Sequence, residues 1–165
     1  MLNVHTLKMS EQEYAQVREL LHRKAGISLG PSKQTLVCGR LFKRVSALQM
    51  SSYGEYFASL ASDARPGELQ TAIDLLTTNE TYFYREPAHF VQLQTMARRA
   101  LDRRESMSIW SAASSSGEEI YTIAMLLQQM VDTGHPLRWE ILGSDISSRV
   151  IASPGSRLVP QRKPG

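Results

Sequence analysis

The chain has 165 residues, of which 42% are hydrophobic and 21% charged, the composition of an ordinary globular protein with one or two domains. No window approaches the roughly 18 apolar residues of a membrane span, and the N-terminus lacks the apolar core of a secretory signal. The single cysteine, Cys38, excludes an internal disulfide, and no Cys/His cluster has metal-ligand spacing. We therefore expect a cytoplasmic protein without a bound metal or a membrane-inserted segment.

The excess of positive over negative charge lies in the first third of the chain. Residues 1–50 contain eight Lys or Arg against three Asp or Glu, whereas residues 51–106 contain six against eight. This local excess predicts an acidic partner for the N-terminal region rather than a generally basic protein.

Helical patterns fill the first hundred residues. Apolar residues recur at helical spacing from Ser10 to Lys24, where Ser10 and Glu13 form a capping-box pattern and Gly26 ends the helix. Further helices are expected, in chain order, over residues 32–48, 53–61, from 68 onward, and 89–101. A charged run follows the last of them, so we expect residues 1–105 to form an all-helical domain.

The second of these helices carries a cluster of cations. Lys33, Arg40, Lys43 and Arg44 fall on an arc beside the apolar face. Such an arc is either a solvated face or a docking face for acidic side chains, and the sequence leaves both open. Nucleic-acid binding is disfavoured, because a phosphate binder usually carries more cations and interleaved aromatics.

The pattern changes to strand, loop, helix and strand between residues 107 and 145. MSIWSA and RWEILGSD are typical of strands, and they flank the helical segment EIYTIAMLLQQMV, which predicts one βαβ unit of a parallel sheet. Ligands bind beyond the carboxyl ends of such strands. The loop Ser111–Gly117 falls there, as does Asp145, which ends the second strand.

The residues at this edge favour a cationic nucleoside over a dinucleotide. The loop has one glycine where the dinucleotide fingerprint has three. The distance in sequence from Gly117 to Asp145 is also longer than the roughly 20 positions between glycine and acidic residue in that fingerprint. Glu118 and Glu119 repel a phosphate but tolerate a sulfonium or an amino group; alternatively they only favour the helix dipole. S-adenosylmethionine carries both a sulfonium and an amino group, and its ribose hydroxyls can donate hydrogen bonds to the Asp145 carboxylate.

Three blocks of sequence carry a family resemblance. LTTNETYFYREPAHF, IWSAASSSGEEIYTIAM and ILGSDIS, in this order behind a helical region, resemble the chemotaxis receptor methyltransferases (CheR-type) over roughly residues 10–152. The resemblance implies an α plus α/β fold, in which an all-helical N-terminal domain precedes the first βαβ portion of a Rossmann-like methyltransferase domain. It also implies an S-adenosylmethionine-dependent protein-glutamate O-methyltransferase of chemotaxis signal transduction. Its substrates are the cytoplasmic helices of chemoreceptors (methyl-accepting chemotaxis proteins), and its product is S-adenosylhomocysteine.

The resemblance also assigns roles to individual residues. It implies cofactor contacts for Asn79, Thr81, Arg85, Ala112, Glu118 and Asp145. Arg85 is in addition the expected catalytic residue beside the methyl-transfer point, with an ion pair to Glu86 or another acidic residue as its alternative role. The residues implied to face the acidic receptor helix are Arg40, Lys43 and Arg44. We expect Tyr82, Phe83 and Tyr84 to be packing residues rather than a stacking platform.

The sequence departs from the family near residue 152. Family members continue with the rest of the sheet, so residues 106–152 are expected to form a partial S-adenosylmethionine-dependent domain, and residues 153–165 a disordered tail outside the family pattern. We expect this truncation to impair activity and the incomplete sheet to cause self-association. The alternative function is a non-catalytic receptor-binding module made of the helical domain.

Overall fold

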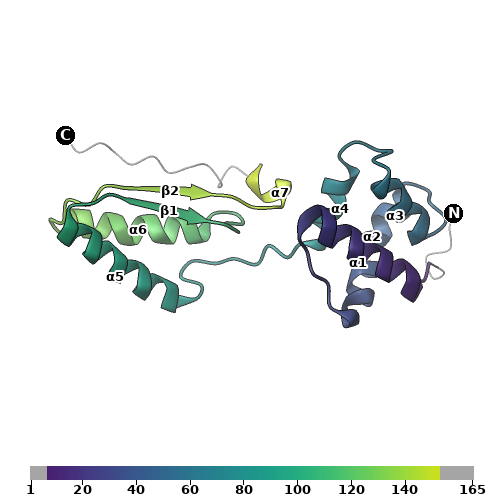
Figure 1. Ribbon diagram of the computed structural model, residues 1–165, viewed down its shortest axis with the longest axis horizontal. Helices are drawn as coiled ribbons and strands as arrows, with labels where there is room; N and C mark the ends of the chain where they lie inside the picture. The colour runs from purple at the N-terminus through teal and green to yellow at the C-terminus, as the bar shows by residue number, and fades with distance from the viewer. Residues whose placement is uncertain (1–6, 153–165) are drawn as a thin grey trace. The chain divides into compact units, whose positions relative to one another are not determined.

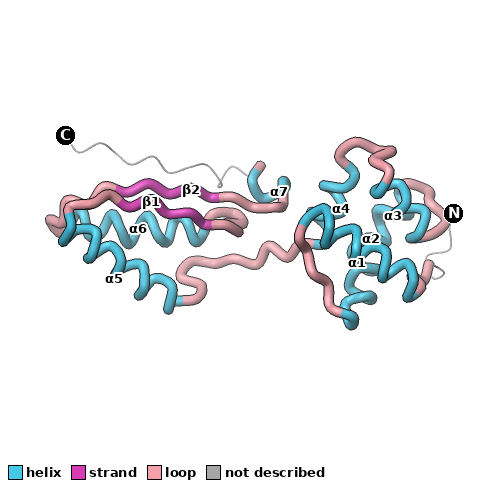
Figure 2. Tube along the Cα trace, in the orientation of Figure 1, coloured by secondary structure: helices cyan, strands magenta, loops and turns pink. Residues whose placement is uncertain are grey.

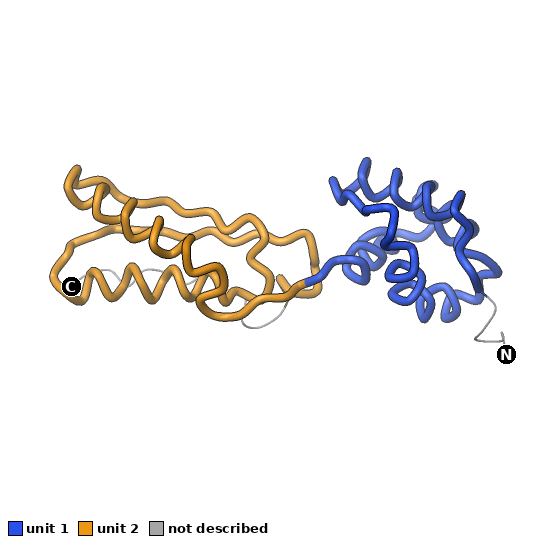
Figure 3. Tube along the Cα trace, turned by 90° about the horizontal axis from the view of Figure 1, so that it is seen from below, with its two compact units in different colours: residues 1–78 blue, residues 79–165 orange. Residues whose placement is uncertain are grey.

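A computed structural model of the chain describes residues 7–152, and the prediction of a disordered tail over residues 153–165 lies outside this range. The elements follow in the order α1, η1, α2, α3, α4, α5, β1, α6, β2 and α7 (Figure 1). They form two compact units, residues 1–78 and residues 79–165 (Figure 3). Among the helices of residues 7–152, none combines the length and the apolar character that a membrane crossing requires.

Helix α1 (Glu11–Ala25) begins and ends where the sequence indicated. The Ser10 side chain accepts a hydrogen bond from the N–H of Glu13, whose carboxylate accepts one from the Ser10 N–H at 2.7 Å, so the predicted capping box is confirmed. Gly26 follows the helix with a φ of 67°, a left-handed conformation that glycine adopts without steric cost. The other Glu13 oxygen accepts a hydrogen bond from the Gly54 N–H at 2.6 Å, which joins α1 to α3.

The first unit contains three more α-helices, all predicted from the sequence. They are α2 (Gln34–Ala47), preceded by the 3-10 turn η1 (Pro31–Lys33), α3 (Tyr53–Ala61) and α4 (Glu68–Leu76). The expected start of the second helix at residue 32 falls within η1. A proline at the first position is compatible with such a turn, and 3-10 turns are frequent at helix starts.

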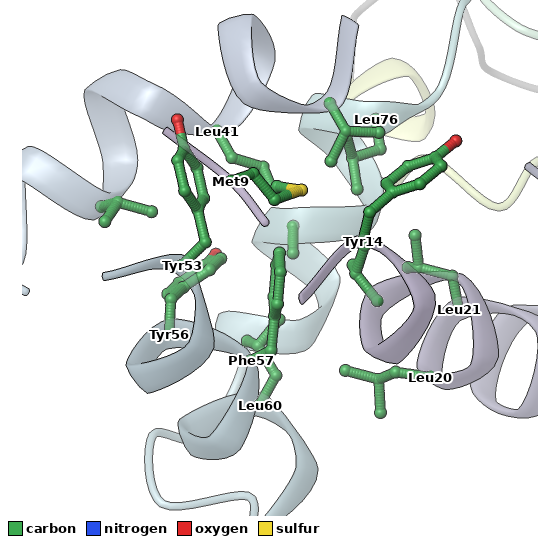
Figure 4. Close-up of a cluster of buried hydrophobic side chains, with 14 of the residues drawn as sticks. Met9, Tyr14, Leu20, Leu21, Leu41, Tyr53, Tyr56, Phe57, Leu60 and Leu76 are labelled. Carbon is green, nitrogen blue, oxygen red and sulfur yellow. The ribbon is translucent and has the colours of Figure 1, made fainter. Parts of the chain in front are cut away.

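The buried faces of these helices form one hydrophobic cluster (Figure 4). Val17 and Leu21 of α1, Leu41 of α2 and Tyr56 of α3 have no exposed surface. Tyr53 is also buried, and its hydroxyl donates a hydrogen bond to the carbonyl oxygen of Cys38 at 3.0 Å. Burial raises the pKa of Tyr53 to about 12, so this hydroxyl stays a donor even at pH values where an exposed tyrosine ionises. The first unit therefore has a core of its own.

The second unit contains the predicted βαβ arrangement. Its elements are α5 (Pro87–Arg103), β1 (Met107–Ser111), α6 (Glu118–Asp132), β2 (Trp139–Gly143) and α7 (Ser148–Ile151). The two strands run side by side (Figure 2). They pair in parallel, with Met107 opposite Trp139 and Ser111 opposite Gly143. The fold class expected from the sequence, helices followed by a parallel βαβ unit, is confirmed.

The two-stranded sheet has one covered and one uncovered face. Trp139 and Ile141 are buried in a second hydrophobic cluster with Phe90 of α5 and Leu127 of α6, and Figure 1 shows both helices on the same side of the strands. On the opposite face, Trp110 and Leu142 are partners in the strand register and are 67% and 56% exposed. One apolar face of the sheet is therefore left uncovered among the described residues.

Helix α5 belongs to the second unit, so the chain divides between Thr78 and Asn79 rather than near residue 105. The reason is that Phe90, Ala97 and Ala100 of α5 are buried in the same cluster as the strands and α6. A change from helical to strand pattern marks the start of the sheet, whereas the start of the second core lies one helix earlier.

Candidate functional site

The loop between β1 and α6 continues the pairing of the two strands beyond their ends. The backbone N–H of Ser144 donates to the carbonyl oxygen of Ser111 at 2.9 Å, and the N–H of Ser114 donates to the carbonyl oxygen of Ser144 at 3.0 Å. Gly117, the residue before α6, has a φ of 105°, which only glycine adopts readily. The loop is therefore fixed at the carboxyl ends of the strands, where parallel sheets bind ligands.

Asp145 follows β2 at this edge, and both of its carboxylate oxygens are held by backbone amides. The N–H of Ser115 donates to Oδ2 at 2.9 Å, and the N–H of Ser147 donates to Oδ1 at 2.8 Å. Each carboxylate oxygen can accept more than one hydrogen bond. The two amides therefore orient the carboxylate and leave it able to accept bonds from a ligand.

Asn79 meets the same two serines from a distant part of the sequence. Its backbone carbonyl oxygen accepts a hydrogen bond from the Ser115 hydroxyl at 3.1 Å, and its side-chain Nδ2 donates to the Ser147 hydroxyl at 3.3 Å. Asn79, Ser115, Asp145 and Ser147 thus form a closed ring of four hydrogen bonds, which we name the polar ring. Two of the residues implied by the resemblance, Asn79 and Asp145, are brought together by it.

Ser115 and Ser147 are the residues that sequence reasoning missed. Both are buried, Ser147 completely. The run of serines at 114–116 and the position of Ser147 before a helix were visible, but serine is common in loops and helix caps. Only the spatial neighbourhood distinguishes these two from the others.

The segment that carries Thr81 and Arg85 lies outside the polar ring. Thr81 is half-buried, and Arg85 is exposed. The Arg85 guanidinium donates to the carbonyl oxygen of Glu80 at 2.5 Å and lies 6.0 Å from the ring of Tyr82. Within residues 7–152 it makes no ion pair, so the alternative pairing with Glu86 is not formed.

The backbone around Arg85 is unusual. Tyr84 has a φ of 61° and Glu86 a φ of 57°, left-handed values that are uncommon for residues with a side chain. The N–H of Tyr84 donates to the Thr122 hydroxyl of α6 at 3.3 Å, which ties this segment to the helix. Strained backbone of this kind often accompanies functional segments.

The packing role predicted for the three aromatic residues is wrong. Tyr82, Phe83 and Tyr84 are 57%, 52% and 49% exposed. The Tyr84 ring makes one edge-to-face contact with Phe90, at 5.9 Å between ring centroids. The three residues precede α5 in a tight turn, and their aromatic surface remains available for contact with other groups.

The start of α6 presents carboxylates rather than cations. Glu118 is half-buried and accepts a hydrogen bond from the Ser116 hydroxyl at 2.8 Å, and Glu119 accepts one from the Ser111 hydroxyl at 2.7 Å. Ala112 is exposed in the loop. Acidic groups at this helix start favour a cationic ligand over a phosphate. Groups of three or more His, Cys, Asp or Glu able to hold a metal do not occur among residues 7–152.

Of the three cations assigned to receptor contact, two have partners within the first unit. Arg40 donates to the carbonyl oxygens of Leu76 and Thr77 at 2.6 and 3.2 Å. Arg44 is paired with the buried carboxylate of Glu68. Lys43 is exposed. The basic arc therefore contains structural contacts as well as a free surface charge.

Comparison with known proteins gives two family matches and several relatives. The family described as "CheR methyltransferase, all-alpha domain" matches residues 12–77, and "CheR methyltransferase, SAM binding domain" matches residues 79–163. The chain is 44% identical to "Chemotaxis protein methyltransferase 2" of Pseudomonas aeruginosa over 142 residues, which cover 86% of this chain and 50% of that protein. It is 39% identical to "Chemotaxis protein methyltransferase" of Escherichia coli over 145 residues, 88% of this chain and 49% of that protein.

The two matched regions meet where the structure divides into units. The polar ring lies wholly within the region matched by the second family description. The chain spans about half the length of the curated relatives that it matches.

Proposed function

The chain belongs to the CheR methyltransferase family, and from that premise we propose that it transfers a methyl group from S-adenosylmethionine to glutamate side chains of chemoreceptors. The names of the relatives, all chemotaxis protein methyltransferases, support this reaction and its setting. We propose that the protein acts in the cytoplasm, where the receptor helices to be modified lie.

The polar ring is the observation that carries this proposal. It holds Asn79 beside Asp145 at the carboxyl ends of β1 and β2. A carboxylate at the end of the second strand suits a pair of ribose hydroxyls. Asn79 lies far away in sequence, and its presence at this edge supports the role that the resemblance implies for it.

The charges around the site support a cationic cofactor. Glu118 and Glu119 begin α6, and Asp145 lies on the neighbouring strand end. Three carboxylates near one sheet edge attract a sulfonium and an amino group, whereas they repel the phosphates of a dinucleotide. We propose that Glu118 faces the amino acid part of the cofactor, with Ala112 and Thr81 among the lining residues.

The proposed chemistry demands little of the protein beyond positioning. When bound, S-adenosylmethionine supplies an electrophilic methyl group. The accepting glutamate is ionised at neutral pH, because its ordinary pKa is about 4.3, so no general base is needed. The protein has to orient the carboxylate and exclude water. Arg85 is exposed and free of ion pairs within residues 7–152, and its guanidinium can bind a carboxylate through two hydrogen bonds.

The binding step is tested by calorimetric titration of the full chain with S-adenosylhomocysteine. We expect measurable affinity for the unaltered chain and a loss of at least tenfold for Asp145→Asn, which removes the charge and one of the two oxygens that accept backbone N–H bonds. Asp132→Asn is the matched control, because Asp132 lies at the far end of α6 and its carboxylate bonds, within residues 7–152, only the Gln128 side chain. Equal affinity of the chain and Asp145→Asn contradicts the proposed site.

A receptor-binding module without catalysis is the second candidate. The first unit supports it, because that unit has its own buried core and its own family match over residues 12–77. Binding of receptor fragments by a chain that gives no heat with S-adenosylhomocysteine favours this alternative.

A further inference from the structure

We propose that Ser115 and Ser147 are positioning residues that hold Asn79 beside Asp145 and so present both side chains to one ligand. This inference rests on the cofactor site proposed above. It assigns a task to two residues that neither the sequence patterns nor the family resemblance singled out.

The hydroxyl of Ser147 bonds Asn79 instead of capping helix α7. Ser147 is the residue before α7, where a serine hydroxyl ordinarily accepts a hydrogen bond from a backbone N–H of the first turn. That capping bond is not made by Ser147. Its fully buried hydroxyl instead accepts from Nδ2 of Asn79, while its own N–H donates to Asp145. A single residue therefore contacts both ligand-facing side chains.

Ser115 occupies a backbone conformation that glycine would adopt with less strain. Its φ is 47°, in the left-handed region. What serine adds over glycine at this position is a hydroxyl, and that hydroxyl donates to the backbone carbonyl oxygen of Asn79 at 3.1 Å. Its N–H, fixed by the same backbone conformation, donates to Asp145. Strain at Ser115 is thus combined with a bond that only a side chain can make.

The two serines leave the ligand-facing groups available. Each uses its backbone N–H for Asp145 and its hydroxyl for Asn79, so removal of a hydroxyl frees Asn79 without touching the bonds to the carboxylate. Within residues 7–152, the side-chain oxygen of Asn79 receives no hydrogen bond. That oxygen and the remaining acceptor positions of Asp145 are the groups that a ligand would meet.

The experiment compares Ser115→Ala, Ser147→Ala and the double variant in the full chain. Ser108→Ala is the matched control, because it removes a serine hydroxyl of the same sheet whose bond, in the described part of the chain, is to Glu140 alone. The first measurement is the backbone order parameter at Asn79 without ligand. We expect a value near the roughly 0.85 of rigid backbone for the unaltered chain and the control, and a value below about 0.6 for the double variant. The amide spectrum of each variant reports whether it is folded.

The second measurement is the dissociation constant for S-adenosylhomocysteine. Each single variant is expected to bind about five- to tenfold more weakly. Asn79→Ala is expected to weaken binding clearly when it is introduced into the unaltered chain. Introduced into the double variant, where Asn79 is already released, it should change the dissociation constant hardly at all. A merely destabilised fold would not produce this loss of additivity.

The outcomes separate the inference from the proposed function. If the unaltered chain does not bind, the proposed cofactor site fails, and the order parameters alone decide whether the serines position Asn79. If Asn79 is as ordered in the double variant as in the unaltered chain, the inference is wrong. It is equally wrong if the unaltered chain binds and the double variant binds as tightly.

Discussion

The guanidinium of Arg44 donates hydrogen bonds to both carboxylate oxygens of Glu68, which is buried. The hydroxyl of Tyr56 donates a third bond to the same carboxylate at 2.8 Å. Arg44 therefore joins α2 to the start of α4 inside the first unit. A residue assigned by resemblance to receptor contact has a structural partner, so its effects on stability and on binding need to be measured separately.

The first prediction concerns Glu68→Gln. Hydrogen bonds to charged groups contribute about 1.5–3 kcal/mol, so we expect the free energy of unfolding of the first unit to fall by about 2 kcal/mol at pH 7. The bond from Arg44 holds the pKa of Glu68 below its ordinary value. The stabilisation is therefore fully present above the unfolded pKa, about 4.3, and is lost as the pH falls through the lower folded pKa.

Urea unfolding followed by circular dichroism between pH 7 and pH 3 measures this effect. The difference between the chain and Glu68→Gln should shrink at the acid end, and a difference that stays constant contradicts the assignment. Glu19→Gln is the control, because the Glu19–Arg23 pair is exposed at 3.5 Å and contributes at most about 1 kcal/mol.

The second prediction separates Arg40 from Lys43. Arg40 donates to backbone carbonyl oxygens at the end of α4, so Arg40→Ala is expected to lower the free energy of unfolding by about 1 kcal/mol. Lys43 is exposed, so Lys43→Ala should change it by less than about 0.5 kcal/mol. If the basic arc contacts acidic receptor helices, Lys43→Ala weakens binding of a receptor fragment in a titration. Unchanged binding at low salt would remove Lys43 from the interface.

The helices of this protein were predictable because their patterns are local. The Ser10–Glu13 capping box, Gly26 and the apolar spacing of α3 and α4 all act within a few residues, and each element lies where the sequence indicated. The unit to which α5 belongs was harder to predict from the sequence. The pattern of α5 indicates a helix, but which core it joins depends on Phe90 meeting residues much later in the chain.

The candidate site was predictable only in part. Asp145 could be expected from its place after a strand, and Asn79 from the family resemblance. The bonds that connect them pass through Ser115 and Ser147. Three of these four bonds span 30 or more positions in sequence and leave no periodic pattern. The exposed aromatic residues were mistaken for packing residues because hydrophobicity alone does not reveal whether another layer covers them.

The third prediction concerns Gly143, at the end of β2. A methyl group there would overlap with Cδ1 of Ile120 and lie 3.0 Å from Oγ of Ser114. Ile120 is buried and has to move, so Gly143→Ala is expected to lower the free energy of unfolding by about 1–3 kcal/mol. Both tryptophans of the chain lie in the second unit, so their fluorescence during urea unfolding reports this change. A midpoint equal to that of the unaltered chain would show that Ile120 accommodates the methyl group.

The fourth prediction concerns Arg85, for which stability and activity should separate. Among the residues that the structure describes, its guanidinium contacts its own segment alone, at Glu80 and Tyr82, so Arg85→Ala is expected to change the free energy of unfolding by less than about 0.5 kcal/mol. Under the proposed function, the same change lowers methyl transfer to a receptor fragment at least tenfold. Arg85→Lys should recover little, because a lysine cannot bind a carboxylate through two parallel bonds. Full activity of Arg85→Ala in a radiolabelled methyl-transfer assay contradicts the assigned role.

The fifth prediction is that the chain associates with itself through the uncovered face of its sheet. Trp110 and Leu142 are neighbours across the two strands and are more than half exposed, and such apolar surface favours contact with another copy. Burial of a leucine contributes about 1.5–3 kcal/mol, so Leu142→Lys is expected to raise the dissociation constant of the dimer at least tenfold. Met125→Lys on α6 makes the same kind of change on another exposed surface and serves as the control. Sedimentation velocity over a range of concentrations measures both. A compact monomer at every concentration contradicts the prediction, and equal effects of the two variants place the contact elsewhere.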